Sequence, residues 1–235
     1  MKKFLFCLVL TAFSLVSFSQ EEGPLWLRYP AISPDGSTIA FSYQGDIYTV
    51  PRSGGEARQI TLHEAYEAHP IWSPDGSKIA FSSLRYGNAD IFIVDAQGGE
   101  PTRLTHHSAN DTPMDFITDG SKVLYSSSRM DHADAVLFPS GVLPEVYEVP
   151  IDGGREMQVM TTPAMDANLN ADGTSLIYHD QKGYEDPYRK HHVSSVTRDI
   201  WTYSLKDSTY NQVSSWEGED RSPIWHMENK YYFLS

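Results

Sequence analysis

The stretch IWSPDGSKIAFSS, residues 71–83, decides how this chain folds. Apolar residues flank a Ser-Pro-Asp-Gly sequence, in which proline presets φ, aspartate bonds nearby backbone and glycine accepts positive φ. A sequence of this kind is typical of a tight turn between two antiparallel strands. A closely similar stretch, AISPDGSTIAFSY, stands at residues 31–43. The recurrence indicates that the chain is built from a repeated unit.

An Asp-Gly pair marks each copy of this unit. Successive pairs lie 40, 44 and 53 residues apart, and an altered copy, Glu228-Asn229, follows 56 residues after the last one. This spacing, with growing insertions, is typical of the blades of a β-propeller. We expect the paired residues to form structural turns: Asp35, Gly36, Asp75, Gly76, Asp119, Gly120, Asp172 and Gly173.

Each copy contains four segments with the pattern of β-strands. The second copy has one strand before the Asp-Gly turn and one after it, a third that opens with an acid in DIFIV at 90–94, and a fourth that ends at Thr105. The third strand is apolar on both faces, which fits a sheet stacked between two neighbours. The sequence therefore predicts an all-β fold, a β-propeller of four-stranded antiparallel blades.

The repeat also predicts how many blades the chain holds. We expect four complete blades and a truncated fifth, from a propeller of six or seven blades. An incomplete fifth blade would leave an apolar sheet face and free strand edges, so we expect either a longer parent protein or a partner that completes the ring. The expected blade limits are approximately 30–61, 70–105, 113–161, 167–214 and 223–235.

Residues 1–19 have the pattern of a signal peptide. Two lysines precede an apolar run, and small residues end the segment. The run is shorter than the roughly 20 residues that a membrane-spanning helix needs. We expect cleavage after Ser19, a periplasmic or secreted protein, and a partial propeller over residues 20–235. The single cysteine, Cys7, lies in this segment, so the mature chain would form no disulfide and no thiolate metal site.

The charge of the chain excludes some classes of partner. It has 18 basic and 31 acidic residues, a net charge of −13, and loss of the two lysines in the signal peptide makes this −15. Nucleic acid and anionic membrane surfaces are bound by basic faces. We therefore expect neither nucleic acid nor, after signal removal, a membrane as partner.

Most chemistry-bearing residues fall on one face of the predicted propeller. Turns between strands one and two and between strands three and four share a face and are short. The opposite face carries the connections between blades and two long insertions, 128–144 and 179–198. We expect a rim there that faces substrate or a partner: His63, Glu67, His69, His106, His107, Asp111, Arg129, His132, Tyr184, Arg189, His191, His192 and Arg221.

Structural roles for some of these side chains stay open. Acids and a histidine stand just before successive first strands, where such residues often bond backbone amides at a blade entrance: His69, Asp111, Asp166 and Asp220. The stretch HEAYEAH at 63–69 resembles a zinc helix, but Glu67 occupies the place of the second histidine. Adjacent His191 and His192 would face opposite ways on a strand. We expect no metal and no cofactor, and a divalent cation on this face is the less favoured alternative.

Catalytic motifs are lacking in the sequence. It contains no G-x-S-x-G elbow, no Gly-rich phosphate loop and no C-x-x-C pair. Serines, histidines and acids are present, but without geometry they do not make a catalytic set. We therefore expect no catalytic residues in this chain.

The repeat resembles a known family. SPDGSKIAFSS with DIFIVDAQGGEPTRLT is similar to the WD-like repeat of the TolB translocation protein, prolyl-oligopeptidase-type propellers and tricorn proteases. Four longer stretches resemble the amino-terminal propeller of exported tricorn-type serine peptidases: LWLRYPAISPDGSTIAFSYQGDIYTVP, FPSGVLPEVYEVPIDGG, RKHHVSSVTRDIW and GEDRSPIW. This resemblance spans essentially the whole mature chain.

The resemblance implies a function without chemistry of its own. In that family, propellers precede a PDZ domain and a serine-peptidase core, and are thought to gate or channel peptides toward the active site. The implied partners are peptides or unfolded protein segments, and the PDZ and peptidase domains of the same parent chain, with homo-oligomers left open. None of the family's catalytic residues has a counterpart in this sequence.

Two other function classes stay open. One is a stand-alone TolB-like propeller that binds envelope proteins, although TolB-like proteins carry a small α/β domain where this chain has only residues 20–29 before its first blade. The other is a propeller-borne hydrolase or cation-dependent lyase that uses the histidine-rich face.

Overall fold

The computed structural model describes residues 26–129, 143–183, 193–226 and 230–235. Within these ranges all regular structure is antiparallel β-sheet, and none of the described residues lies in a helix. Accordingly, none of the described residues belongs to a helix that is long and apolar enough to cross a membrane. The expected signal peptide, residues 1–19, lies outside the described part.

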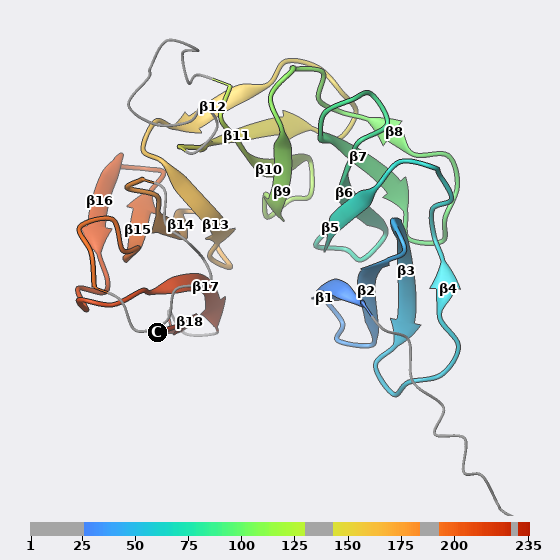
Figure 1. Cartoon of the computed structure of the whole chain (residues 1–235), viewed down its shortest axis with the longest axis horizontal. Coiled ribbons are helices and arrows are strands. Elements are labelled where there is room, and N and C mark those ends of the chain that lie inside the picture. The colour runs from blue at the N-terminus through green and yellow to red at the C-terminus, as the bar shows by residue number, and fades with distance from the viewer. Residues whose placement is uncertain (1–25, 130–142, 184–192, 227–229) are drawn as a thin grey trace, which may run out of the picture.

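Five sheets follow one another around an arc, with the first strand of each innermost (Figure 1). Blade 1 contains β1 (Arg28–Ile32), β2 (Thr38–Tyr43), β3 (Asp46–Pro51) and β4 (Arg58–Gln59). Blade 2 contains β5 (Glu67–Trp72), β6 (Lys78–Ser83), β7 (Asp90–Asp95) and β8 (Thr102–Arg103). Blade 3 contains β9 (Asp111–Phe116), β10 (Lys122–Ser127), β11 (Glu145–Pro150) and β12 (Met157–Met160).

Blade 4 contains β13 (Ala164–Leu169), β14 (Ser175–Asp180), β15 (Ile200–Ser204) and β16 (Thr209–Gln212). The fifth sheet has two described strands, β17 (Arg221–His226) and β18 (Lys230–Leu234). The predicted fold class, a propeller of four-stranded blades with a fifth present in part, is confirmed.

Turn chemistry joins the first and second strands as the sequence predicts. In blade 2, the Asp75 carboxylate accepts hydrogen bonds from Ser73 Oγ at 2.6 Å and from Ser77 N at 3.0 Å. These bonds stabilise the ionised form and lower the pKa of Asp75 to about 2. The glycine that follows each turn aspartate has a φ of 70–73°, which suits glycine best: Gly36, Gly76, Gly120 and Gly173.

A hydroxyl side chain fixes the end of the outer strand in three blades. The amide N–H of the second residue of the third-strand motif donates to this hydroxyl at 2.9 Å each time: Ile47 to Thr61, Ile91 to Thr105, and Ile200 to Ser214. This repeated bond explains why a threonine or serine closes the motif, because the hydroxyl satisfies a backbone donor that the short fourth strand leaves free.

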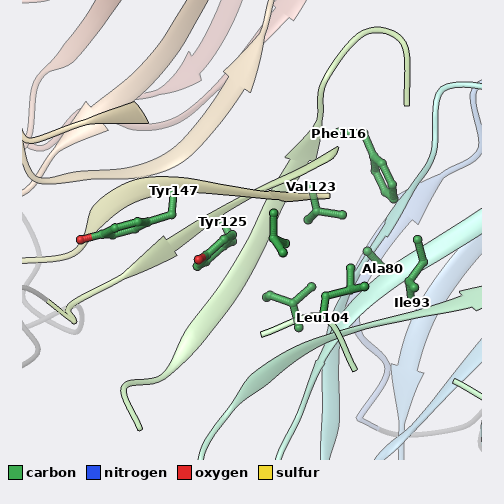
Figure 2. Close-up of a cluster of buried hydrophobic side chains, with 9 residues drawn as sticks. Ala80, Ile93, Leu104, Phe116, Val123, Tyr125 and Tyr147 are labelled. Carbon is green, nitrogen blue, oxygen red and sulfur yellow. The ribbon is translucent and has the colours of Figure 1, made fainter. Parts of the chain in front are cut away.

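The hydrophobic core lies between blades rather than within them. Residues of β7 alternate: Ile91 and Ile93 pack in the cluster shared with blade 3, whereas Phe92 and Val94 pack in the cluster shared with blade 1. All four are at most 6% exposed. Figure 2 shows the cluster between blades 2 and 3. The expectation that a third strand is buried on both faces is met in β7, because each of these side chains faces one of the two neighbouring blades.

Polar bonds at one repeat position join adjacent blades. Trp72 Nε1 donates to the Ala31 carbonyl at 3.0 Å, and Trp225 Nε1 donates to the Asn168 carbonyl at 3.1 Å. Between blades 3 and 4 the equivalent bond involves a carboxylate, because Asp115 Oδ2 accepts a hydrogen bond from Leu169 N at 2.9 Å. Removal from water raises the pKa of Asp115 to about 6.

Candidate functional site

The innermost strands carry a bulge with positive φ at the same repeat position in four blades. Each bulge holds a non-glycine residue with a φ of 50–55°, which is uncommon for such residues. The antiparallel register shifts at each of these points. We call these residues the inner bulge set: Tyr29, His69, Asp166 and Ser222. Blade 3 has Pro113 at this place, whose ring does not allow positive φ, but its register also shifts between Pro113 and Asp115.

The bulges move the first strands from their expected limits. We expected blades to begin near residues 70, 113, 167 and 223, but the strands begin at 67, 111, 164 and 221. A bulge lets a strand continue upstream of an irregular residue. As a result His69, Asp111 and Asp166 lie within first strands, whereas Asp220 directly precedes one.

Members of the inner bulge set contact one another across blade boundaries. The rings of Tyr29 and His69 lie 3.8 Å apart between their centroids, and Ser222 Oγ donates to Asp166 Oδ2 at 2.8 Å. Burial lowers the pKa of His69, and the negative charge of Asp166 partly opposes this effect. The side chain of Asp166 stays 46% exposed, so its carboxylate remains open to a ligand on the inner surface.

Buried His179, from β14, supports this part of the inner surface. Its Nδ1 accepts a hydrogen bond from Ser222 N at 3.2 Å and lies 3.7 Å from Asp166 Oδ2. Burial lowers the pKa of His179 to about 4, with nearby Arg198 and Arg221 lowering it further and Asp166 opposing them. The imidazole is therefore neutral at neutral pH and acts as an acceptor through Nδ1.

This serine, histidine and aspartate do not form a catalytic triad. A triad needs a hydrogen bond from the serine Oγ to the histidine, which in turn bonds the aspartate. Here Ser222 Oγ donates to Asp166, and His179 receives the backbone N–H of Ser222 instead. The arrangement orients polar groups but activates no nucleophile.

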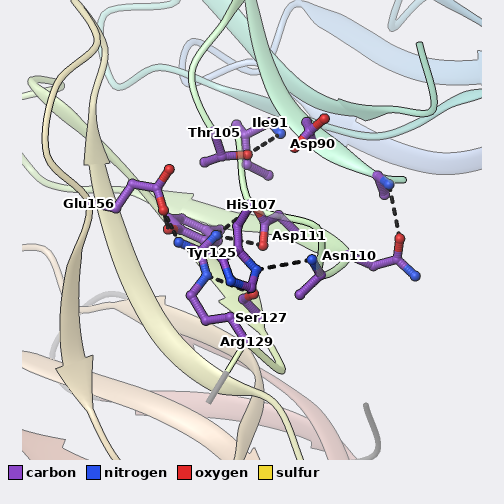
Figure 3. A network of polar contacts seen from close by, with 12 residues as sticks. Asp90, Ile91, Thr105, His107, Asn110, Asp111, Tyr125, Ser127, Arg129 and Glu156 are labelled. Carbon is purple, nitrogen blue, oxygen red and sulfur yellow. Dashed lines mark hydrogen bonds and ion pairs between the residues drawn. The ribbon is translucent and has the colours of Figure 1, made fainter. Parts of the chain in front are cut away.

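Two of the expected rim acids are buried in ion pairs. Glu67 Oε1 accepts from Arg85 Nη2 at 2.7 Å, and Asp111 accepts from Arg129 Nη2 at 2.8–2.9 Å (Figure 3). Both acids are 0% exposed, and the side chain of Arg129 is 10% exposed. They do not face solvent as expected of a rim, because each acid starts a first strand and its arginine folds back from the loop after the second strand.

The rim histidines are divided between turn caps and free surface. His63 Nδ1 accepts from Ala65 N at 2.9 Å, and His107 Nδ1 accepts from Ala109 N at 3.0 Å. These two occupy equivalent positions in successive blade connections and cap the same turn. His106 and Arg221 are exposed. The remaining expected rim residues lie outside the described residues: His132, Tyr184, Arg189, His191 and His192.

Sequence reasoning missed Arg85 and one groove, and it expected Arg129 on an exposed rim rather than in a buried ion pair. Arg85 and Arg129 each stand two positions after the last serine of a second strand, a spacing that SSLR and SSSR display but whose acidic partners are distant in sequence. The face with the short turns has a groove of about 650 Å³ between blades 1 and 2, which the sequence does not indicate. Asp35, Arg58 and Trp72 are among the residues that line it. Among the described residues, no three His, Cys, Asp or Glu side chains are grouped to hold a metal ion.

Comparison with solved structures shows the same architecture. The tricorn protease matches with a TM-score of 0.70 and 23% identity, over 88% of this chain and 20% of that one. TolB from Acinetobacter baumannii matches with a TM-score of 0.60 and 20% identity, over 83% of this chain and 45% of that one. An oligogalacturonate lyase in complex with manganese matches with a TM-score of 0.57 and 15% identity, over 79% and 52%. At these identities the likeness is one of fold.

Sequence comparison identifies the family. No curated protein sequence matches the chain significantly. The family of the tricorn protease N-terminal beta propeller domain matches over residues 24–235, which includes all described blades. The chain spans less than half the length of the tricorn protease and TolB chains that it resembles. It belongs to the family of tricorn protease N-terminal β-propeller domains.

Proposed function

We propose that this chain is the non-catalytic propeller portion of a tricorn-like serine peptidase, and that it guides unfolded peptide segments toward a peptidase core elsewhere in the parent protein. The observation that carries the proposal is the inner bulge set, which supplies polar side chains on the innermost strands without an activated nucleophile. Family membership supplies the link to a peptidase.

The chemistry of the inner surface favours peptides with basic side chains. Asp166 offers a half-exposed carboxylate that is already oriented by Ser222. Tyr29 and His69 add a paired aromatic surface on the innermost strands of blades 1 and 2. A chain with net charge −13 also attracts cationic segments over a distance. A partly exposed, oriented acid and aromatic rings on the innermost strands suit lysine and arginine side chains.

The proposal extends to location and assembly. A signal peptide at residues 1–19 would direct the chain to the periplasm or outside the cell. The blades would also act as a scaffold for PDZ and peptidase domains of the same parent chain, as the family membership suggests.

Peptide binding provides the test. A fluorescein-labelled, unstructured, lysine-rich peptide should show raised anisotropy with the chain, and raising the salt concentration should weaken binding. Asp166→Asn keeps an acceptor for Ser222 but removes the charge, and should weaken binding on the order of tenfold. Asp207→Asn, at an exposed turn of blade 4, is the matched control and should leave binding unchanged.

Two results would contradict the proposal. Equal affinity of the Asp166→Asn and Asp207→Asn variants would remove the inner surface from the binding site. Cleavage of the peptide by the chain alone, detected by mass spectrometry, would show that it is catalytic.

A further inference from the structure

One backbone bond places three acidic residues at equivalent positions in blades 2, 3 and 5. The amide N–H of each acid donates to the carbonyl of the residue before the aspartate that opens the third-strand motif of the preceding blade: Glu67 to Gly45 at 2.8 Å, Asp111 to Ala89 at 2.7 Å, and Asp220 to Arg198 at 3.0 Å. All three residues are buried, at 0%, 0% and 1% exposure. Asp220 is therefore the blade 5 counterpart of Glu67 and Asp111.

The first two of these acids have an arginine partner at one register position. Glu67 pairs across the sheet with Ser83, and its ion-pair partner Arg85 stands two residues further on. Asp111 pairs across the sheet with Ser127, and Arg129 again stands two residues further on. Both serine hydroxyls also bond this group, Ser83 to the acid at 3.2 Å and Ser127 to the arginine at 3.1 Å. The repeated unit thus consists of an acid on the first strand, a serine opposite it on the second strand, and an arginine two residues after that serine.

Among the described residues, Asp220 has no such partner. Both of its carboxylate oxygens are buried, and neither has a hydrogen-bond partner in the part of the chain that the structure describes. The guanidinium of nearby Arg198 is engaged with Glu219. A buried carboxylate with no counter-charge is strongly destabilising, so a partner should be strongly favoured.

We propose that Asp220 is a buried guanidinium-binding site, which an arginine two residues beyond Ser235 in the parent chain fills. Arg221 pairs with Leu234, so Asp220 faces Ser235, just as Glu67 faces Ser83 and Asp111 faces Ser127. The fifth repeat thus contains the acid and the facing serine of the unit and lacks its cation within the described residues.

Blade 4 indicates why the cation is a guanidinium rather than an ammonium. There Lys182 occupies the arginine position, and the first-strand acid is replaced by Ala164. Lys182 bonds Asp180 and Asp199 instead, at 3.4 Å and 2.5 Å. Lysine therefore accompanies acids on the second and third strands, whereas an acid at the start of the first strand accompanies arginine. Asp220 stands at the equivalent position of blade 5, so an arginine is its expected partner.

A two-residue extension tests the inference on the chain itself. Serine-arginine is added after Ser235 in one protein and serine-glutamine in its matched control, and thermal unfolding of both is measured. We expect the arginine extension to raise the melting temperature on the order of 5 °C above the glutamine extension. The same pair of extensions in an Asp220→Asn background should show no difference. An equal gain in both backgrounds would overturn the inference.

The unextended chain gives a second readout. Asp220→Asn should leave its stability unchanged or raise it, because the substitution removes an unpaired buried charge. Asp111→Asn should lower stability, because Arg129 then loses its partner. A loss from Asp220→Asn as large as that from Asp111→Asn would mean that Asp220 already has its cation. Resistance of blade 5 to limited proteolysis reports the same differences if thermal unfolding is not cooperative.

The parent coding sequence is an independent check. An apolar or acidic residue two positions after Ser235 would overturn the inference. None of these measurements involves peptide binding, so their outcome is separate from that of the proposed function.

Discussion

Arg129 binds Asp111 through one guanidinium nitrogen, Nη2, which lies 2.9 Å from Oδ1 and 2.8 Å from Oδ2. The same guanidinium lies over the rings of Tyr125 and Tyr147, with its carbon 5.2 Å and 4.9 Å from their centroids, and also pairs with Glu156. One side chain thus links the first, second and third strands of blade 3 to the segment before the fourth, and Figure 3 shows it with Asp111, Tyr125 and Glu156.

Removing this cation should destabilise the fold strongly. Arg129→Met keeps an apolar chain of similar length but leaves Asp111 buried without a counter-charge, so we expect a loss of about 3–5 kcal/mol in the free energy of unfolding. Lys78→Met is the control, because the Lys78–Asp95 pair is exposed and should contribute less than about 1 kcal/mol. Urea unfolding measures both, and similar losses would contradict a structural role for Arg129.

A turn glycine should matter more than a rim histidine. Gly76 has a φ of 71°, which strains a β-branched side chain, so Gly76→Val should cost at least about 1–2 kcal/mol. The sequence alone suggests that His107 lacks an essential partner, but its Nδ1 caps Ala109 N. His107→Ala should therefore cost about 0.5–1 kcal/mol rather than nothing. Urea midpoints that place His107→Ala below Gly76→Val in stability would refute this order.

Asp115 should make the protein less stable as pH rises. The folded state holds the proton more tightly than the unfolded state, because burial raises the pKa of Asp115 to about 6 from 3.8. Its contribution to stability therefore falls between about pH 4 and pH 6 and is constant above. We expect a fall on the order of 1–2 kcal/mol after allowance for partial exposure.

Asp115→Asn isolates this contribution. The variant still offers one oxygen to Leu169 N but does not titrate, so the stability of the wild type relative to the variant should fall across this pH window. Asp119→Asn, at an exposed turn, should leave the shape of the pH profile between pH 4 and 6 unchanged. Parallel pH profiles for wild type and Asp115→Asn in urea unfolding would contradict the assignment.

The repeated parts of the fold could be predicted from sequence, because their chemistry is local. Asp75 and its neighbouring serines form a turn whatever surrounds them, and the alternation of β7 between two cores follows from its apolar residues alone. The starts of the first strands could not be predicted from sequence. A backbone bulge accepts residues as different as Tyr29 and Asp166, so the bulged positions share no side-chain signal.

The ion pairs at the candidate site could not be predicted from sequence either. Arg129 stands in a recognisable spacing after β10, but its partner Asp111 lies 18 residues earlier on a strand expected to begin later. Only the register of β9 against β10 brings them together. The sequence therefore suggests that Asp111 and Arg129 are exposed on a rim, whereas the fold buries them.

His179 should give a pH effect of opposite sign. Burial lowers its pKa to about 4 from 6.5, so the unfolded state takes up a proton first as pH falls. Stability should therefore fall from about pH 6.5 down to pH 4, by up to about 3 kcal/mol, whereas the Asp115 effect favours the folded state in the acidic part of this range.

His179→Asn retains an acceptor for Ser222 N without titrating and should flatten the profile between pH 6.5 and 4. Exposed His226→Asn is the control, and urea unfolding followed by tryptophan fluorescence should show its profile parallel to wild type. A wild-type profile that also runs parallel to His179→Asn would mean that folding does not lower the pKa of His179, and would contradict the assignment.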